Sequence, residues 1–252
     1  MDAVGNRTLR DLLIERECRY GESTCLVFVD EDSSVTEFTY SEFLDRVRSV
    51  ASGFDRLGIA KGDKVVVHLP NCPQFLFAWF GLASIGAVTV PSNIENHHAE
   101  LGHVISFSDA VGVVTNLEHK KLVGAVADDN PAVTLRVLVD GIESGWTPWS
   151  QVDTGGTPPD VEIDSSDLAE LLFTSGTTAL PKAIMLTHAN CLFTGEREGR
   201  IMGLTPDDRC RTALPAFHSN AQGVTILPCL ERRRDGDPAR RIQCTAVLAY
   251  RT

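Results

Sequence analysis

The feature that most constrains the fold is the regular alternation of short β-branched segments with helical segments between residues 65 and 139. Residues 65–67 form a β-branched run, residues 73–83 have the pattern of a helix with proline at its start, and residues 87–90 form a second apolar run. The same order continues with a helix near 100–107, a strand over 111–115, a helix over 118–127 and a strand over 135–139. This alternation predicts an α/β fold with a mostly parallel sheet flanked by helices.

A further helix is predicted ahead of this region, over residues 41–57. Thr39 and Glu42 have the spacing of a capping box, apolar residues recur at helical spacing, and Gly58 follows as a stop signal. After the alternating region, residues 140–160 are rich in Gly, Pro, Ser and Trp, which is typical of a surface connection. We take this stretch as a subdomain boundary.

One stretch also fits a membrane segment, because residues 65–94 contain no Asp, Glu, Lys or Arg. A membrane-spanning helix needs about 20 apolar residues in a row. Pro70, Pro73 and Pro91 interrupt this stretch, so the pattern favours a buried helix between two buried strands. We therefore expect no membrane span.

Composition and charge narrow the function classes. The chain is 43% hydrophobic and 23% charged, which is typical of a globular protein, and its net charge of -11 argues against nucleic-acid binding through phosphates. Its seven cysteines are odd in number and contain no Cys-x-x-Cys pair. The first 20 residues lack the apolar core of a secretory signal. These features favour the cytoplasm and small molecules or proteins as ligands.

The segment most indicative of chemistry follows the apolar run 168–173, which suits a buried strand although Glu170 interrupts it. A strand that ends in small hydroxylated residues around a glycine can direct backbone N–H groups and hydroxyls at a phosphate, and a lysine adds positive charge. The alternative is a Thr/Ser-rich hairpin turn with a solvated lysine. The residues concerned are Thr174, Ser175, Gly176, Thr177, Thr178 and Lys182.

Other site patterns are weak. The segment lacks the P-loop spacing, and the chain has neither a Gly-x-Gly-x-x-Gly turn nor a Gly-x-Ser-x-Gly elbow. His97, His98 and His103 have no carboxylate or cysteine partner at a recognisable spacing, so no metal site is predicted from the sequence.

Residues 173–190, reading Phe-Thr-Ser-Gly-Thr-Thr-Ala-Leu-Pro-Lys-Ala-Ile-Met-Leu-Thr-His-Ala-Asn, resemble the phosphate-binding signature of the adenylate-forming superfamily, which includes acyl-CoA synthetases and luciferase. The resemblance implies that the six residues from Thr174 to Lys182 named above bind the ATP phosphates, with Lys182 also catalytic. Ala179 and Ala183 replace two usual glycines. Each adds a methyl group that restricts the backbone.

Two more segments follow the order of this family, 84–93 and Leu-Pro-Ala-Phe-His at 214–218. The resemblance implies that His218 gates an acyl pocket, whereas from the residues alone it could equally be a hydrogen-bonded loop histidine. His188 follows Thr187, a plausible helix N-cap, and we interpret it as structural. The run at 68–83, reading His-Leu-Pro-Asn-Cys-Pro-Gln-Phe-Leu-Phe-Ala-Trp-Phe-Gly-Leu-Ala, most resembles bacterial carnitine/crotonobetaine-CoA ligases, which is a hint about the substrate only.

The resemblance implies a fold that is the N-terminal part of the large domain of an acyl-CoA synthetase, truncated at about residue 230. A complete member would use ATP and Mg2+ to adenylate a small carboxylic acid and would pass the acyl group to CoA. The segments that hold magnesium and the ribose are missing from this sequence. We therefore expect a truncated ligase without acyl-CoA ligase activity, with a non-catalytic nucleotide-binding or protein-interaction remnant as the alternative.

The last residues differ in character from the rest. Residues 231–252 hold six arginines and three acidic residues, a charge of +3, whereas residues 1–230 carry -14. We expect residues 1–230 to form the partial AMP-binding domain and residues 231–252 to be an aberrant, disordered tail. On this view, deleting the tail leaves thermal stability nearly unchanged.

Overall fold

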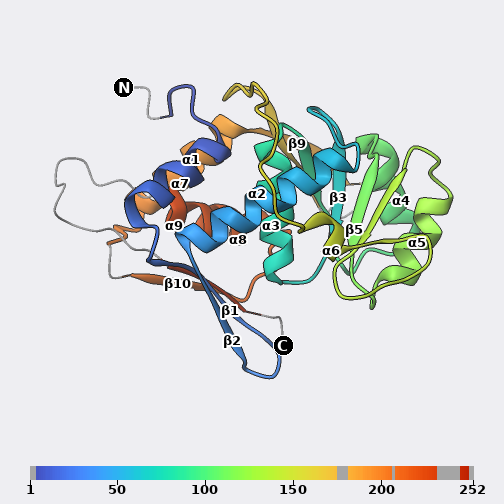
Figure 1. Ribbon diagram of the computed structural model, residues 1–252, viewed down its shortest axis with the longest axis horizontal. Helices are drawn as coiled ribbons and strands as arrows, with labels where there is room; N and C mark the ends of the chain where they lie inside the picture. The colour runs from blue at the N-terminus through green and yellow to red at the C-terminus, as the bar shows by residue number, and fades with distance from the viewer. Residues whose placement is uncertain (1–3, 175–180, 206–207, 232–244, 250–252) are drawn as a thin grey trace.

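The structure, a computed structural model, describes residues 4–174, 181–205, 208–231 and 245–249 (Figure 1). Its larger sheet has the strand order β7-β6-β5-β3-β4-β8-β9, and every neighbouring pair is parallel except β8 with β9. The strands are β3 (Lys64–His68), β4 (Val88–Pro91), β5 (Gly112–Thr115), β6 (Leu135–Leu138), β7 (Thr147–Pro148), β8 (Leu168–Thr174) and β9 (Lys182–Thr187). The predicted mostly parallel α/β fold is confirmed.

Four helices connect or cover these strands close to the predicted positions: α2 (Tyr40–Arg56), α3 (Pro73–Ser84), α4 (His98–Ser108) and α5 (Lys120–Asp128). Thr39 caps α2, and the capping box with Glu42 is present. The side chains of β3 alternate between two hydrophobic clusters, because Val65 and Val67 face the cluster that contains α2 and α3, while Val66 faces the cluster that contains α4 and α5. Helices therefore cover both faces of the sheet (Figure 1).

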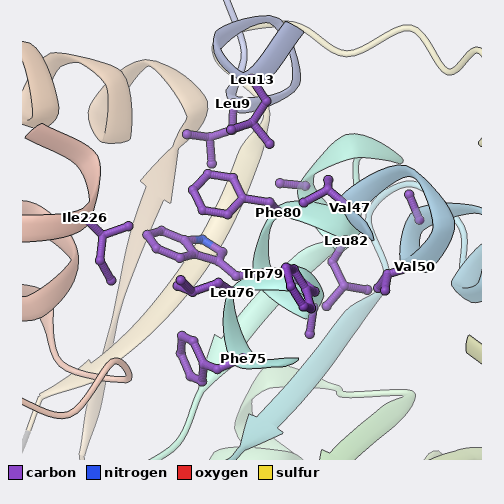
Figure 2. Close-up of a cluster of buried hydrophobic side chains, with 14 of the residues drawn as sticks. Leu9, Leu13, Val47, Val50, Phe75, Leu76, Trp79, Phe80, Leu82 and Ile226 are labelled. Atoms are coloured by element: carbon purple, nitrogen blue, oxygen red, sulfur yellow. The ribbon is translucent and has the colours of Figure 1, made fainter. Parts of the chain in front are cut away.

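Helix α3 lies at the centre of the larger cluster. All its residues except Gln74 are buried, including Trp79. Figure 2 shows Trp79 among side chains from α1 (Leu9–Tyr20), α2 and the residue Ile226. The uncharged stretch 65–94 is thus a buried strand–helix–strand unit, and none of the helices described is both long and apolar enough to cross a bilayer.

A smaller sheet has the order β10-β11-β1-β2, with strands β1 (Thr24–Val29), β2 (Val35–Thr39), β10 (Arg209–Thr212) and β11 (Thr245–Ala249). Strand β11 is parallel to both of its neighbours, with Leu26 opposite Ala246. The expected disorder of the tail is wrong for these five residues. Without β11, the backbone groups along one edge of β1 would lack sheet partners. The other tail residues, 232–244 and 250–252, lie outside the described residues.

The charge pattern predicts that Glu231 belongs to the aberrant tail, residues 231–252, and the structure shows that this prediction is wrong for Glu231. It is the last residue of α9 (Leu227–Glu231) and is fully buried. Arg7 donates to its two carboxylate oxygens at 2.6 and 3.1 Å, and Arg16 donates to its backbone carbonyl at 2.7 Å. Burial lowers the pKa of Arg16, and the charge of Glu231 opposes that shift. A buried carboxylate requires such cationic partners, so Glu231 belongs to the folded body.

Residues 140–160 also differ from the expected surface connection, because they contain β7 and the short helix α6 (Trp149–Val152). Val152 is fully buried against α2. The approach is so close that a Cβ on Gly53 would lie 1.9 Å from the carbonyl oxygen of Val152. A glycine in α2 therefore admits the backbone of α6, and this pairing could not be read from local composition.

Glu170 is the one acidic residue of β8 and is fully buried. Gln222 donates to its Oε1 at 2.8 Å, and within the described residues Oε2 has no hydrogen-bond partner. Burial raises the pKa of Glu170 to about 8, and the bond from Gln222 opposes this only in part. The side chain is therefore mostly protonated at neutral pH.

The first prediction concerns Glu231. Replacing it by Gln removes the carboxylate that Arg7 binds and that lies 3.9 Å from the buried guanidinium of Arg16, so Glu231→Gln should lower the free energy of unfolding by about 3 kcal/mol. The exposed pair of Asp45 with Arg48 supplies a control, and Asp45→Asn should cost about 0–1 kcal/mol. Deleting residues 231–252 should also destabilise the protein. Urea unfolding measures all three, and equal midpoints for wild type and Glu231→Gln would contradict the assignment.

The second prediction concerns pH. The pKa of Glu170 is about 8 in the folded protein against an ordinary 4.5, so its contribution to stability is fully present below pH 4.5 and is lost as pH rises to about 8. Glu170→Gln removes this titration. Relative to wild type, the variant should gain on the order of 3–4 kcal/mol in free energy of unfolding between pH 5 and pH 8. Denaturant titrations at both pH values measure the difference, and a difference independent of pH would refute the assignment.

Candidate functional site

The residues predicted to bind phosphate lie at the carboxyl end of β8. Thr174 is the last residue of β8 and Lys182 is the first residue of β9, and the two are opposite each other in the antiparallel pair. Both are exposed, and the Thr174 hydroxyl donates to the carbonyl oxygen of Lys182 at 3.3 Å. The predicted strand over 171–173 is present, with Leu171 and Leu172 buried and Phe173 partly buried. Ser175, Gly176, Thr177 and Thr178 lie outside the described residues.

This geometry is compatible with both readings of the segment. The loop joins two antiparallel strands, as the hairpin-turn alternative requires, and it begins at the carboxyl edge of a parallel sheet, as a ligand site requires. In the described part of the chain no carboxylate forms an ion pair with Lys182, so its ammonium group faces no competing anion there. The surroundings of the hairpin therefore decide between the readings.

A cavity of about 260 Å³ lies beside Thr174. Because β4 and β8 are parallel neighbours, their carboxyl ends meet, and the residues after β4 form one wall. His218 also lines this cavity, so two predicted site residues, far apart in sequence, line one cavity. Its lining has no charged residue and consists of Pro91, Ser92, Asn93, Asn96, Val104, Leu172, Phe173, Thr174, Pro181, Ile184, Phe217, His218 and Ser219.

His218 is a hydrogen-bonded loop histidine, as one of its two sequence interpretations predicts. It precedes the short helix α8 (Ser219–Ala221) as its N-cap, where Nδ1 accepts the backbone N–H of Asn220 at 3.2 Å. The backbone N–H of His218 donates to the backbone carbonyl of Pro215 at 2.9 Å. With Nδ1 accepting, a neutral His218 ring carries its proton on Nε2. It is thus a hydrogen-bonded loop histidine that also lines the cavity.

His188 has a structural role, as predicted. It begins α7 (His188–Ile201), which Thr187 caps. The ring is fully buried, and Nδ1 accepts the backbone N–H of Leu9 at 3.1 Å. Burial lowers the pKa of His188 to about 4, so the ring is neutral at pH 7 and joins α7 to α1.

His103, for which the sequence predicts no metal site, has a structural role that no sequence pattern indicates. Its Nε2 lies 3.0 Å from the carbonyl oxygen of Pro181, next to Lys182, and its ring packs edge-on against Phe173. Helix α4 thereby holds the start of β9. Residues 103 and 181 are 78 positions apart, so no local pattern could have indicated this contact.

Ala183, one of the two departures from the family signature, fits without strain. It lies in β9 opposite Phe173 and packs against the second hydrophobic cluster. Its φ is not positive, so a side chain costs nothing at this position. Ala179, the other departure, lies outside the described residues.

Magnesium has no evident protein ligands here. Across the described ranges, no group of three or more His, Cys, Asp or Glu side chains is placed to hold a metal ion. The described residues therefore do not form a magnesium site.

Comparison with known proteins identifies the family. Residues 14–233 match the model of the AMP-binding enzyme family. Crotonobetaine/carnitine–CoA ligases from Salmonella enteritidis and Salmonella choleraesuis are 34% identical over 238 residues. The match covers 90% of this chain and 46% of each relative, so the chain spans about half their length.

Solved structures agree. The apo structure of MbtA from Mycobacterium smegmatis has a TM-score of 0.85 at 28% identity, over 98% of this chain and 44% of that one. The anthranilate CoA ligase AuaEII, solved with anthranoyl-AMP, has the same fold, with a TM-score of 0.85 at 18% identity over 96% of this chain and 45% of that one. This chain belongs to the AMP-binding enzyme family, the adenylate-forming superfamily whose signature its residues 173–190 resemble.

Proposed function

We propose that this chain binds the phosphates of ATP at the end of β8, as the N-terminal part of an acid–thiol ligase that adenylates a carboxylic acid. The observation that carries the proposal is the cavity that brings Thr174 and His218 together beside the hairpin of Lys182. A solvated turn would not require a cavity at its base or a histidine in the lining of that cavity. The proposal extends to Ser175, Gly176, Thr177 and Thr178 through the family signature.

Each residue has a role that follows from its chemistry. The Lys182 ammonium neutralises phosphate oxygens, and the Thr174 hydroxyl, now bonded to the carbonyl of Lys182, can turn to donate to them. His218 lines the adjacent cavity and gates the acid. The finer substrate assignment, a small carboxylic acid with CoA as acyl acceptor, rests on the names of the relatives.

In the complete reaction, a carboxylate oxygen attacks the α-phosphorus of ATP, the bond to the β-phosphate breaks, and pyrophosphate leaves. The CoA thiol then attacks the acyl carbon and AMP leaves. We assign the first binding step to this chain.

We also propose a cytoplasmic location, because within the described residues no disulfide joins the cysteines.

A non-catalytic nucleotide-binding or protein-interaction remnant is the second candidate. It is favoured by the lack of a metal-ligand cluster in the described part of the chain. Acid-dependent exchange of pyrophosphate into ATP separates the two. Exchange by the purified chain would establish catalysis, whereas ATP binding without exchange fits both candidates, because a truncated ligase can also bind ATP without turnover.

The third prediction tests the phosphate site. Removing a charge-assisted contact costs about 1.5–3 kcal/mol, so Lys182→Ala should raise the Kd for ATP by about tenfold or more. Lys121→Ala removes an exposed lysine from α5 and is the matched control, with an expected Kd within about twofold of wild type. Isothermal titration calorimetry measures each. A wild-type chain that does not bind millimolar ATP, or equal losses in both variants, would refute the proposal.

A further inference from the structure

The cavity wall that carries His218 is not part of a regular helix or strand. We call residues 214–218 the gate segment. It lies between β10 and α8. Ala216 at the middle of this segment is 1% exposed, so its backbone N–H and C=O need partners within the protein. Two amide side chains from other parts of the chain supply them.

Asn71 supplies the first partner. It lies in the loop between β3 and α3, within the run 68–83, and it is 3% exposed. Its Oδ1 accepts the N–H of Ala216 at 2.6 Å, and its Nδ2 donates to the carbonyl of Leu214 at 3.0 Å. One carboxamide thus closes a two-point contact on the gate segment, across 145 residues of sequence.

Gln222 supplies the second partner of the Ala216 backbone. It is the first residue of the π-helical turn η1 (Gln222–Ile226) and is 2% exposed. Its Nε2 donates to the carbonyl of Ala216 at 3.0 Å and to Oε1 of Glu170 at 2.8 Å. Short π-helical turns re-aim a side chain that a regular helix would place elsewhere. Gln222 therefore links the gate segment to β8, the strand that ends at Thr174.

We propose that Asn71 and Gln222 are positioning residues that hold His218 at the cavity wall, in a fixed relation to β8. Both polar groups of Ala216 are held, and His218 follows two residues later with its own N–H bonded to Pro215. The inference rests on the proposed function, because it assigns the two amides a part in the site that His218 gates. Neither Asn71 nor Gln222 is among the residues that line the cavity.

The experiment measures the gate segment directly, in the full chain and without nucleotide. The variants are Asn71→Leu and Gln222→Met, which keep volume and remove the hydrogen bonds. Asn116→Leu is the matched control, since Asn116 is also buried, also follows a strand of the sheet, and accepts the backbone N–H of His119. Residue-level hydrogen exchange and long-range 1H–15N spectra of the histidine rings are recorded, with His218→Gln to assign the ring signals.

The expected result is at least tenfold faster exchange of the Ala216 amide in Asn71→Leu, and a loss of the single Nε2–H tautomer of His218 in both Asn71→Leu and Gln222→Met. Asn71→Asp keeps an acceptor and should restore slow exchange at Ala216. The control should change neither signal. If Asn71→Leu does not fold, Gln222→Met carries the test through the ring spectrum.

Unchanged His218 signals in a folded Gln222→Met, or equal changes in Asn116→Leu, would overturn the positioning role. Since no nucleotide is present, this result is independent of the calorimetric test at Lys182. Failure of ATP binding would refute the phosphate site and leave the contacts of the gate segment standing, so the two failures are distinguishable.

Discussion

The structure depends on the burial of helix α3. Large side chains such as Trp79 and Phe80 contribute about 1.5–3 kcal/mol each when removed from water, and α3 places them between the sheet, α1 and α2. This burial fixes the crossover from β3 to β4. Asn71 precedes the helix, and the residues that follow β4 line the cavity. The helix therefore fixes the loop that carries Asn71 and the segment after β4 that lines the cavity.

The strands and helices between residues 64 and 138 could be predicted because each has a recognisable pattern within its own short stretch of sequence. A β-branched run that is buried on both faces has few alternatives to a parallel strand, and proline at the start of α3 marks its boundary. The tail could not be predicted in this way. Glu231 was counted with the arginines that follow it, whereas its partner Arg7 is 224 positions away. Local charge gives no information about such a pair.

The candidate site shows the same division. Thr174 and Lys182 were found from the sequence because six residues between positions 174 and 182 carry the phosphate-binding pattern. The contacts that shape their surroundings join distant segments, as in His103 to Pro181 and Asn71 to Ala216. Ala183 is compatible with the site because it lies in an extended strand, which only the antiparallel pairing of β8 and β9 reveals.

The most direct test of phosphate binding at the end of β8 is paramagnetic broadening of backbone amide signals by Mn2+–ATP. Broadening falls steeply with distance from the metal, and Leu168 lies about 20 Å from Thr174 along the same strand, at about 3.3 Å per residue. Substoichiometric Mn2+–ATP should broaden the amides of Thr174 and Lys182 and leave that of Leu168 sharp. Equal broadening at Leu168 and Thr174, or the same pattern with Mn2+ alone, would contradict a nucleotide site at this edge of the sheet.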